Sequence, residues 1–354
     1  MTVQPRRHSR AGLFAPFILV LVALAAWSVC WFYLANQVQA RLDSQAQLLR
    51  NAGWTIQYKH AGVGGWPFRT RLETTDVRLA APSGHALSAP RLVAQANSWQ
   101  PDKWVLVAPD SLTLTRAEKG DVKITGLAIR GSVHGLTQRW PNIALELAEP
   151  VFTAQPGAEA FPISAAKKIE FYLRPHLGPA TQPGIENDVD VLFRLIEARG
   201  RAGGPVEGMA RNGMLTAQIE AVIEHADRLN GPDAAGVMSA WSKAGGRFTG
   251  VRGEIKAGDS GARLSSDLLF ARADGRLEGQ LALQAEKPLP AIAGLARSGG
   301  AGINPVGAAG AAAATAVTGG PAGSGGGDVN LTLLFKDGRT FLGPFAMAPA
   351  PKLF

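Results

Sequence analysis

The sequence is short of the residues and motifs that most enzymes and metalloproteins need. It has a single cysteine, Cys30, inside an apolar stretch, so the rest of the chain has no disulfide and no thiol chemistry. Its six histidines are far apart, and it contains neither an H-E-x-x-H motif nor the Gly-Lys pair of a phosphate-binding loop. Although the net charge is +8, no block of like charges is present. We therefore expect no metal, no cofactor and no nucleic-acid partner.

The few motifs that are typical of catalytic sites fail on their context. Gly258-Asp259-Ser260-Gly261 is similar to the nucleophile surroundings of chymotrypsin-like proteases, but it lies where two strands need a turn. Asp188 and Asp190 fall on one face of a strand, where solvated side chains are the simpler interpretation. The sequence thus predicts no catalytic residue, and we expect that the protein is not an enzyme.

What the sequence does contain is a long uncharged stretch near its start. Residues 13–34 carry no charge and, as a helix, would span about 33 Å, enough to cross a bilayer. Arg6, Arg7 and Arg10 in the tail 1–12 place that tail in the cytoplasm by the positive-inside rule, and the remainder on the other side of the membrane. A signal peptide cleaved after Val38-Gln39-Ala40 is the alternative, and either interpretation exports most of the chain.

The apolar pattern continues past the span. Residues 35–53 have helical spacing and predict a juxtamembrane helix. The domain 54–354 is rich in short alternating runs bounded by Gly, Pro, Asp or Asn, a pattern that favours antiparallel strands in a meander. Exceptions are helical patterns near residues 233–244 and 288–297, and a Gly/Ala-rich stretch, 299–327, which we expect to be a flexible insertion.

The longest alternating runs lie between residues 163 and 226. They place Phe171, Phe193 and Ile219 on the apolar faces of three strands, with charged residues on the other faces. We therefore predict a mainly β fold: a large curved antiparallel sheet or half-barrel with one or two helices, preceded by a single transmembrane helix. The apolar face is the candidate surface for a ligand.

The connection around Trp66, Pro67 and Phe68 is the most distinctive loop of the sequence. Gly64 and Gly65 supply unusual backbone angles there, and the aromatic rings can close a corner of the sheet. The alternative is a recognition lip formed by the same three residues.

These residues also carry a family resemblance. With a single N-terminal span, then Gly65-Trp66-Pro67-Phe68-Arg69, a late Trp241 segment and the C-terminal run from Phe335 to Pro351, the chain resembles the uncharacterised Gram-negative membrane proteins grouped as domain of unknown function 2125. That resemblance implies a location in the cell envelope and supplies no activity. Together with the span and the arginines before it, we expect a single-pass protein of the inner membrane with a cytoplasmic N-terminus and a periplasmic main domain. The layout is more loosely similar to AsmA-like β-groove proteins, whose curved sheets shield lipid chains, a comparison of folds alone.

Three functions remain open on the sequence alone. The first is a non-enzymatic envelope protein whose apolar sheet face holds a lipid or another hydrophobic ligand. The second is a structural or scaffolding module that binds an envelope protein partner, with the apolar face packed as core. The third is a hydrolase of envelope polymers, which would need a pair of converging carboxylates.

Overall fold

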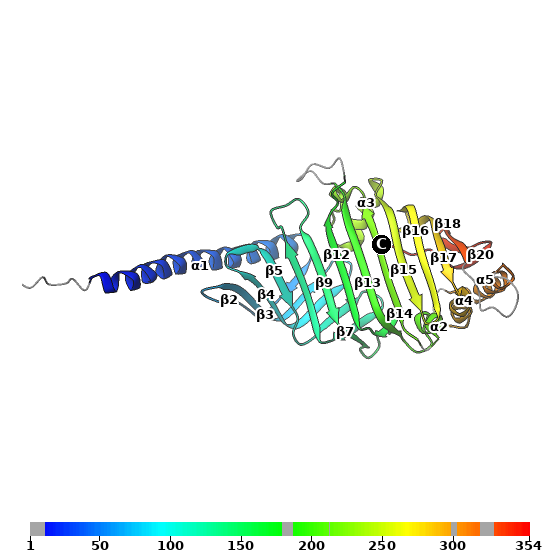
Figure 1. The fold of residues 1–354 in the computed structure, drawn as a ribbon, viewed down its shortest axis with the longest axis horizontal. Coiled ribbons are helices and arrows are strands. Elements are labelled where there is room, and N and C mark those ends of the chain that lie inside the picture. The colour runs from blue at the N-terminus through cyan, green and yellow to red at the C-terminus, as the bar shows by residue number, and fades with distance from the viewer. Residues whose placement is uncertain (1–10, 179–186, 212, 299–302, 319–328) are drawn as a thin grey trace, which may run out of the picture.

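The computed structural model describes residues 11–178, 187–211, 213–298, 303–318 and 329–354. Over these residues, twenty strands form one antiparallel sheet with five α-helices around it, so the expected mainly β fold is confirmed (Figure 1). The helices are α1 (Ala11–Asn51), α2 (Pro205–Ala210), α3 (Ala234–Lys243), α4 (Pro288–Arg297) and α5 (Pro305–Thr318), with a short 3-10 turn at Ala226–Arg228. The strands are β1 (Thr55–Gln57), β2 (His60–Gly64), β3 (Arg69–Ala80), β4 (Ala86–Asn97), β5 (Gln100–Val107), β6 (Leu112–Arg116), β7 (Gly120–Thr125), β8 (Ala128–His134), β9 (Asn142–Ala148), β10 (Val151–Ala154), β11 (Ile163–Ala165), β12 (Lys168–Pro175), β13 (Val189–Gly200), β14 (Leu215–Ile223), β15 (Arg247–Ala257), β16 (Ser260–Ala271), β17 (Leu277–Glu286), β18 (Val329–Lys336), β19 (Arg339–Leu342) and β20 (Phe345–Pro349).

Helix α1 joins the expected span 13–34 and the expected juxtamembrane helix 35–53 into one continuous element. It is long and apolar enough to cross a membrane, a property that anchors and signal sequences share. Its first part extends well beyond the sheet, and its second part packs on β1, β2 and β3 (Figure 1). Trp31, Ala35 and Ala46 are buried on one helical face. Contact with the β domain therefore begins inside the predicted span.

The main path through the sheet is an antiparallel ladder that runs from the helix to the far end of the domain. It passes from β3 through β4, β5, β8, β9 and β12 to β13. From β13 each strand pairs with the next along the chain as far as β20. Strands β1 and β2 both pair with β3 and begin the sheet beside α1. The expected meander is thus most regular in its second half.

A second, shorter path leaves the main one at β4 and rejoins it at β13. It runs through β6, β7, β10 and β11, and β11 pairs with the last residues of β13. The two paths close a ring of strands, and apolar side chains from both paths fill its interior, with Ala108, Ile124 and Ile129 at the centre. The domain is therefore a closed two-layered ring on one side of β13 and a single curved sheet on the other.

The helices of the C-terminal half differ in part from what the sequence predicts. Helix α3 begins where expected, because the Asp233 side chain accepts a hydrogen bond from the Gly236 amide (2.8 Å). The expectation of a flexible insertion at 299–327 is wrong for Pro305–Thr318, which form helix α5. Alanine is the strongest helix former, and Ala308 and Ala311 are buried against α4 and the last strands. The rest of 299–327 lies outside the described residues, except 303 and 304.

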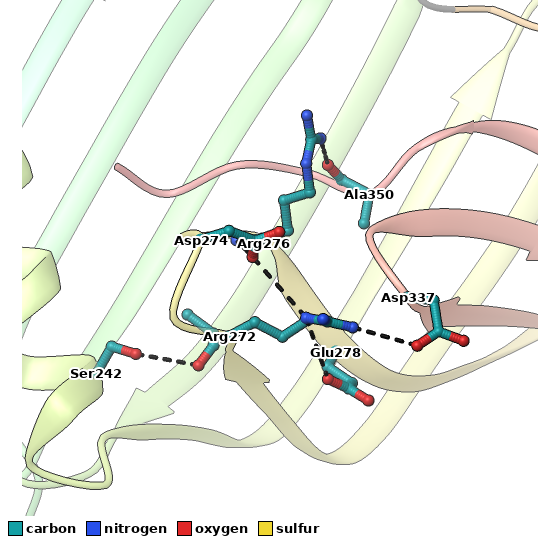
Figure 2. A network of polar contacts seen from close by, with 8 residues as sticks. Ser242, Arg272, Asp274, Arg276, Glu278, Asp337 and Ala350 are labelled. Carbon is teal, nitrogen blue, oxygen red and sulfur yellow. Dashed lines mark hydrogen bonds and ion pairs between the residues drawn. The ribbon is translucent and has the colours of Figure 1, made fainter.

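A clasp at the end of the chain holds the C-terminal segment against the turn between β16 and β17 (Figure 2). The guanidinium of Arg272 lies 3.3 Å from the Asp337 carboxylate and 3.9 Å from that of Glu278. Arg276 donates a hydrogen bond from its guanidinium to the Ala350 carbonyl oxygen (2.9 Å). Exposed ion pairs each contribute little to stability, so we assign the clasp a positioning role for the chain end.

Candidate functional site

The three strand residues predicted for the apolar face, Phe171, Phe193 and Ile219, lie side by side. Phe171 of β12 is directly opposite Phe193 of β13, and Phe193 is directly opposite Ile219 of β14. On the other side, Leu145 of β9 is opposite Phe171. Because neighbouring strands are about 4.8 Å apart, these four side chains form a strip about 14 Å across.

This strip is the middle of a much longer register row, which we call the apolar row. At the same register level, β2 and every strand of the main path from β3 to β18 each contribute an aliphatic residue, a phenylalanine or a glycine. In spatial order the row is Val63, Leu72, Ala94, Leu106, Gly131, Leu145, Phe171, Phe193, Ile219, Gly253, Leu264, Leu283 and Leu331. The row thus connects the strands beside α1 with the strands beside α5.

The middle of the apolar row is open to solvent. The residues Leu145, Phe193 and Ile219 are between 37% and 51% exposed, and Phe171 between them is half-buried. Two residues further along the same strands, Leu195 and Ala217 are buried in the core where α2 and β11 cover the sheet. We call Leu145, Phe171, Phe193 and Ile219 the open apolar patch. It marks a stretch of the apolar face that no other described element covers.

Glycine 253 keeps the sheet tight beside this patch. A Cβ atom at Gly253 would lie 2.4 Å from the carbonyl oxygen of Gln218 and 2.9 Å from the side chain of Leu264. Only a residue without a side chain fits between β14 and β16 at this level. At Gly253, directly next to Ile219, the apolar row therefore has no side chain that rises above the backbone of the sheet.

The other predicted site residues, Trp66, Pro67 and Phe68, do not join the open apolar patch. They form the turn between β2 and β3, beside α1. The indole N–H of Trp27 donates to the Pro67 carbonyl oxygen (2.8 Å), and the indole N–H of Trp66 donates to the Ser28 hydroxyl (3.1 Å). Trp66 and Phe68 are exposed, and Pro67 is partly buried. The turn therefore connects the sheet to the helix.

The opposite face of the same strands is strongly polar. The nearly buried carboxylate of Glu170 lies 2.7 Å from the Lys168 ammonium and 3.2 Å from the Arg194 guanidinium, and it accepts a hydrogen bond from the Tyr172 hydroxyl (2.9 Å). The hydrogen bond from Lys168 is the main cause that lowers the pKa of Glu170, against the opposing effect of burial. Burial, and then the bond to Glu170, raise the pKa of Tyr172. The network is built of paired charges and fixes the strands together.

A concavity of about 910 Å³ lies where strands β9 and β13 begin and strands β12 and β14 end. Residues of the polar face make up most of its lining, and none of the open apolar patch belongs to it. His176 there is paired with Asp190 (2.6 Å), as in the base of a catalytic triad. Ser132, in the same lining, makes no side-chain hydrogen bond among the described residues, so no nucleophile is joined to that pair. Nor do the described residues hold a cluster of three metal-ligating side chains.

Sequence patterns missed two features of this site. Alternation predicts the face on which each strand residue lies, but Leu145 was not singled out because its strand is short. The indole bonds of Trp27 and Trp31 to the β2–β3 turn were also missed, since both residues lie in the uncharged stretch 13–34 that predicts a membrane span. In both cases the residues could be recognised in the sequence, but the residues that they contact could not, because those contacts depend on strand register and on the docking of α1.

Comparison with known proteins gives one match. A family model described as "Uncharacterized protein conserved in bacteria (DUF2125)" matches residues 31–351. No curated protein and no solved structure matches the chain. The looser similarity to AsmA-like proteins thus finds no support in these comparisons.

Proposed function

We propose that this chain, which belongs to the uncharacterised bacterial family DUF2125, is a membrane-anchored protein that holds a lipid or another hydrophobic ligand on the open apolar patch without catalysing a reaction. The observation that carries the proposal is the apolar row. A register-matched row of aliphatic and aromatic side chains that is open in its middle is a surface that favours an extended hydrocarbon chain.

Charge and contact support the choice of the open apolar patch over the concavity. An acyl chain gains free energy only where apolar surface is removed from water, at about 25 cal/mol per Å². Leu145, Phe193 and Ile219 offer such surface, whereas the concavity combines aliphatic side chains with charged groups such as Arg174 and Asp190. A hydrocarbon in the concavity would separate these charges from water at a cost.

The proposed topology follows from the arginines before the span. Arg6, Arg7 and Arg10 keep the N-terminus in the cytoplasm of a single-pass inner-membrane protein, and the β domain then lies in the periplasm. An uncleaved anchor is favoured over a signal peptide because Trp31 is buried against the domain and donates a hydrogen bond to the Arg69 carbonyl oxygen (2.8 Å). Cleavage after Ala40 would remove this contact.

Photocrosslinking in cells that express the full chain tests the proposal. A photoreactive phenylalanine analogue at Phe193 lies on the open apolar patch, and the same analogue at the adjacent Leu192 lies on the opposite face. We expect lipid adducts, detected by mass spectrometry of the purified protein, from position 193 and not from position 192. Equal yields from the two positions would contradict the proposal.

A matched pair of charged variants sharpens the test. Ile219→Glu places a carboxylate on the open apolar patch, and Gln218→Glu places the same group on the opposite face of the same strand, where the side chain is also exposed. We expect Ile219→Glu to lower the lipid adducts at position 193 by more than about tenfold, since an acyl chain cannot solvate the charge, and Gln218→Glu to leave them unchanged. Protein adducts in place of lipid adducts would favour the scaffolding role instead.

A further inference from the structure

Three aromatic side chains stand exposed at the end of the sheet that meets α1. Trp66 and Phe68 come from the β2–β3 turn, and Trp99 comes from the β4–β5 turn. All three are 48–62% exposed, and the rings of Phe68 and Trp99 meet edge to face, 6.5 Å apart. We call these three residues the aromatic tip. In a soluble environment such a cluster exposes a large apolar area to water, which is unfavourable.

The aromatic tip lies beside the part of α1 that is expected to be inside the membrane. Trp27 donates to the Pro67 carbonyl and Trp31 to the Arg69 carbonyl, so both contacts fall within the span 13–34. Along a helix, Trp27 lies about 10 Å before Leu34, where the uncharged stretch ends. A domain held at this level of the helix cannot stand clear of the bilayer that the helix crosses.

The backbone of the aromatic tip is prepared for an apolar environment. Unpaired carbonyl groups are costly in a membrane, where water does not reach them. Here the carbonyl oxygen of Gly65 accepts from the Arg69 amide (2.9 Å), and that of Phe68 accepts from the Ser98 amide (3.0 Å). The carbonyls of Pro67 and Arg69 are paired with the two indoles of α1 described above. The turn therefore presents rings to its surroundings while these four carbonyl groups are satisfied internally.

The side chains around the aromatic tip fit a lipid interface. Phe32 and Tyr33, which follow Trp31 on α1, are exposed, and exposed tryptophan and tyrosine are the residues that membrane interfaces favour. Arg69 and Lys103 are exposed close by along the chain, as is the acidic Asp102, so the tip is followed by polar residues suited to the headgroup region. A protein partner would need no span beside the tip.

We infer that the aromatic tip inserts into the headgroup–acyl boundary of the bilayer that α1 crosses and seats the sheet directly on that membrane. This inference rests on the anchoring role of α1 in the proposed function. Phe68 has the same strand parity as Thr70 and Leu72, so it lies on the face of the apolar row. The seated tip therefore places the start of the apolar row, at Val63 and Leu72, against the lipid surface.

Depth-dependent quenching in the full-length protein tests the inference. In a Cys30→Ser background, single cysteines at positions 68 and 99 are labelled with an environment-sensitive fluorophore, and the protein is reconstituted into vesicles of phosphatidylethanolamine and phosphatidylglycerol with spin-labelled lipids. Position 29, exposed on the span, is the positive control. Position 127 is the negative control, since Leu127 is 79% exposed but precedes β8 at the end of that strand away from Trp104.

We expect quenching at positions 68 and 99 by lipids labelled near the headgroup and the upper acyl region, quenching at 29 by the same lipids because the neighbouring Trp27 and Ser28 contact the β2–β3 turn, and none at 127. Labels at 68 and 99 that behave like 127 while 29 is quenched would overturn the inference and leave the anchor intact. An unquenched label at position 29 would refute the anchor itself, and with it this inference. As a second readout, Phe68→Asp in the protein labelled at position 99 should reduce quenching there, whereas Leu127→Asp should not.

Discussion

Replacing Trp31 by alanine should loosen the contact between α1 and the sheet far more than replacing its neighbour Phe32. Trp31 is 5% exposed and donates a hydrogen bond to the Arg69 carbonyl, whereas Phe32 faces away from the domain. Tryptophan buries about 150–250 Å², which at about 25 cal/mol per Å² corresponds to about 4–6 kcal/mol. Truncations of buried tryptophan cost about 3–5 kcal/mol in practice, and we adopt this range for the docking of α1.

Hydrogen exchange followed by mass spectrometry measures this loss in the full chain. The Arg69 amide is bonded to Gly65 within the β2–β3 turn, so its exchange reports how often the turn opens. A loss of about 3–5 kcal/mol corresponds to exchange about 150- to 5,000-fold faster in Trp31→Ala. Exchange in β13, which α1 does not contact, should stay unchanged.

The control decides whether the contact or the helix itself matters. Phe32→Ala changes an exposed side chain on the same turn of α1 and should alter exchange at Arg69 by less than about threefold, since surface substitutions are usually within about 0.5 kcal/mol. Equal acceleration in the two variants, or an acceleration in Trp31→Ala below about tenfold, would refute a specific docking of α1 through Trp31.

Two further predictions concern the sheet. Lys168 lowers the pKa of Glu170, so the stability that the ionised Glu170 carboxylate contributes is fully present above the usual pKa of 4.5 and is lost as the pH falls through the lower folded-state pKa. In urea denaturation at neutral pH, Glu170→Gln should therefore be less stable than the parent by about 1–3 kcal/mol, and this difference should shrink below pH 4.5. A difference that does not depend on pH would contradict the assignment. Gly253→Ala forces a Cβ against the Gln218 carbonyl and should lower the free energy of unfolding by about 1–3 kcal/mol. Gly261→Ala, where the nearest atom would be 3.8 Å from the new Cβ, should be tolerated. Equal losses of stability in the two variants would show that the close approach of the strands is not the cause.

The sequence predicts the faces of the strands well because side-chain direction alternates within a single strand. Phe171, Phe193 and Ile219 were each assigned to an apolar face without any knowledge of their neighbours. That Phe193 lies directly opposite Ile219 depends on the register between strands, which a one-residue slip would reverse. The strip could therefore be predicted in composition but not in its continuity.

Composition was a poorer guide where packing decides the structure. Residues 305–318 have few large side chains to bury, so their composition favours a flexible segment although alanine is a strong helix former. Their small residues nevertheless fit closely: Ala308 and Ala311 are buried, and a Cβ at Gly307 would lie 1.9 Å from the Ala346 carbonyl oxygen. Small residues allow a helix to approach β20 at short distance, and that tertiary contact is not visible in local composition.

The number of neighbouring strands also determines how wide the sheet is. Each strand adds about 4.8 Å perpendicular to the strand direction, so one additional hairpin extends the sheet by about 10 Å. Because β16, β17 and β18 pair in chain order beyond the core that covers β13, a hairpin can be inserted there without disturbing the ring between β4 and β13. The reach of the domain from its helix is therefore set by the number of hairpins, and it can change in steps while the attachment to α1 stays the same.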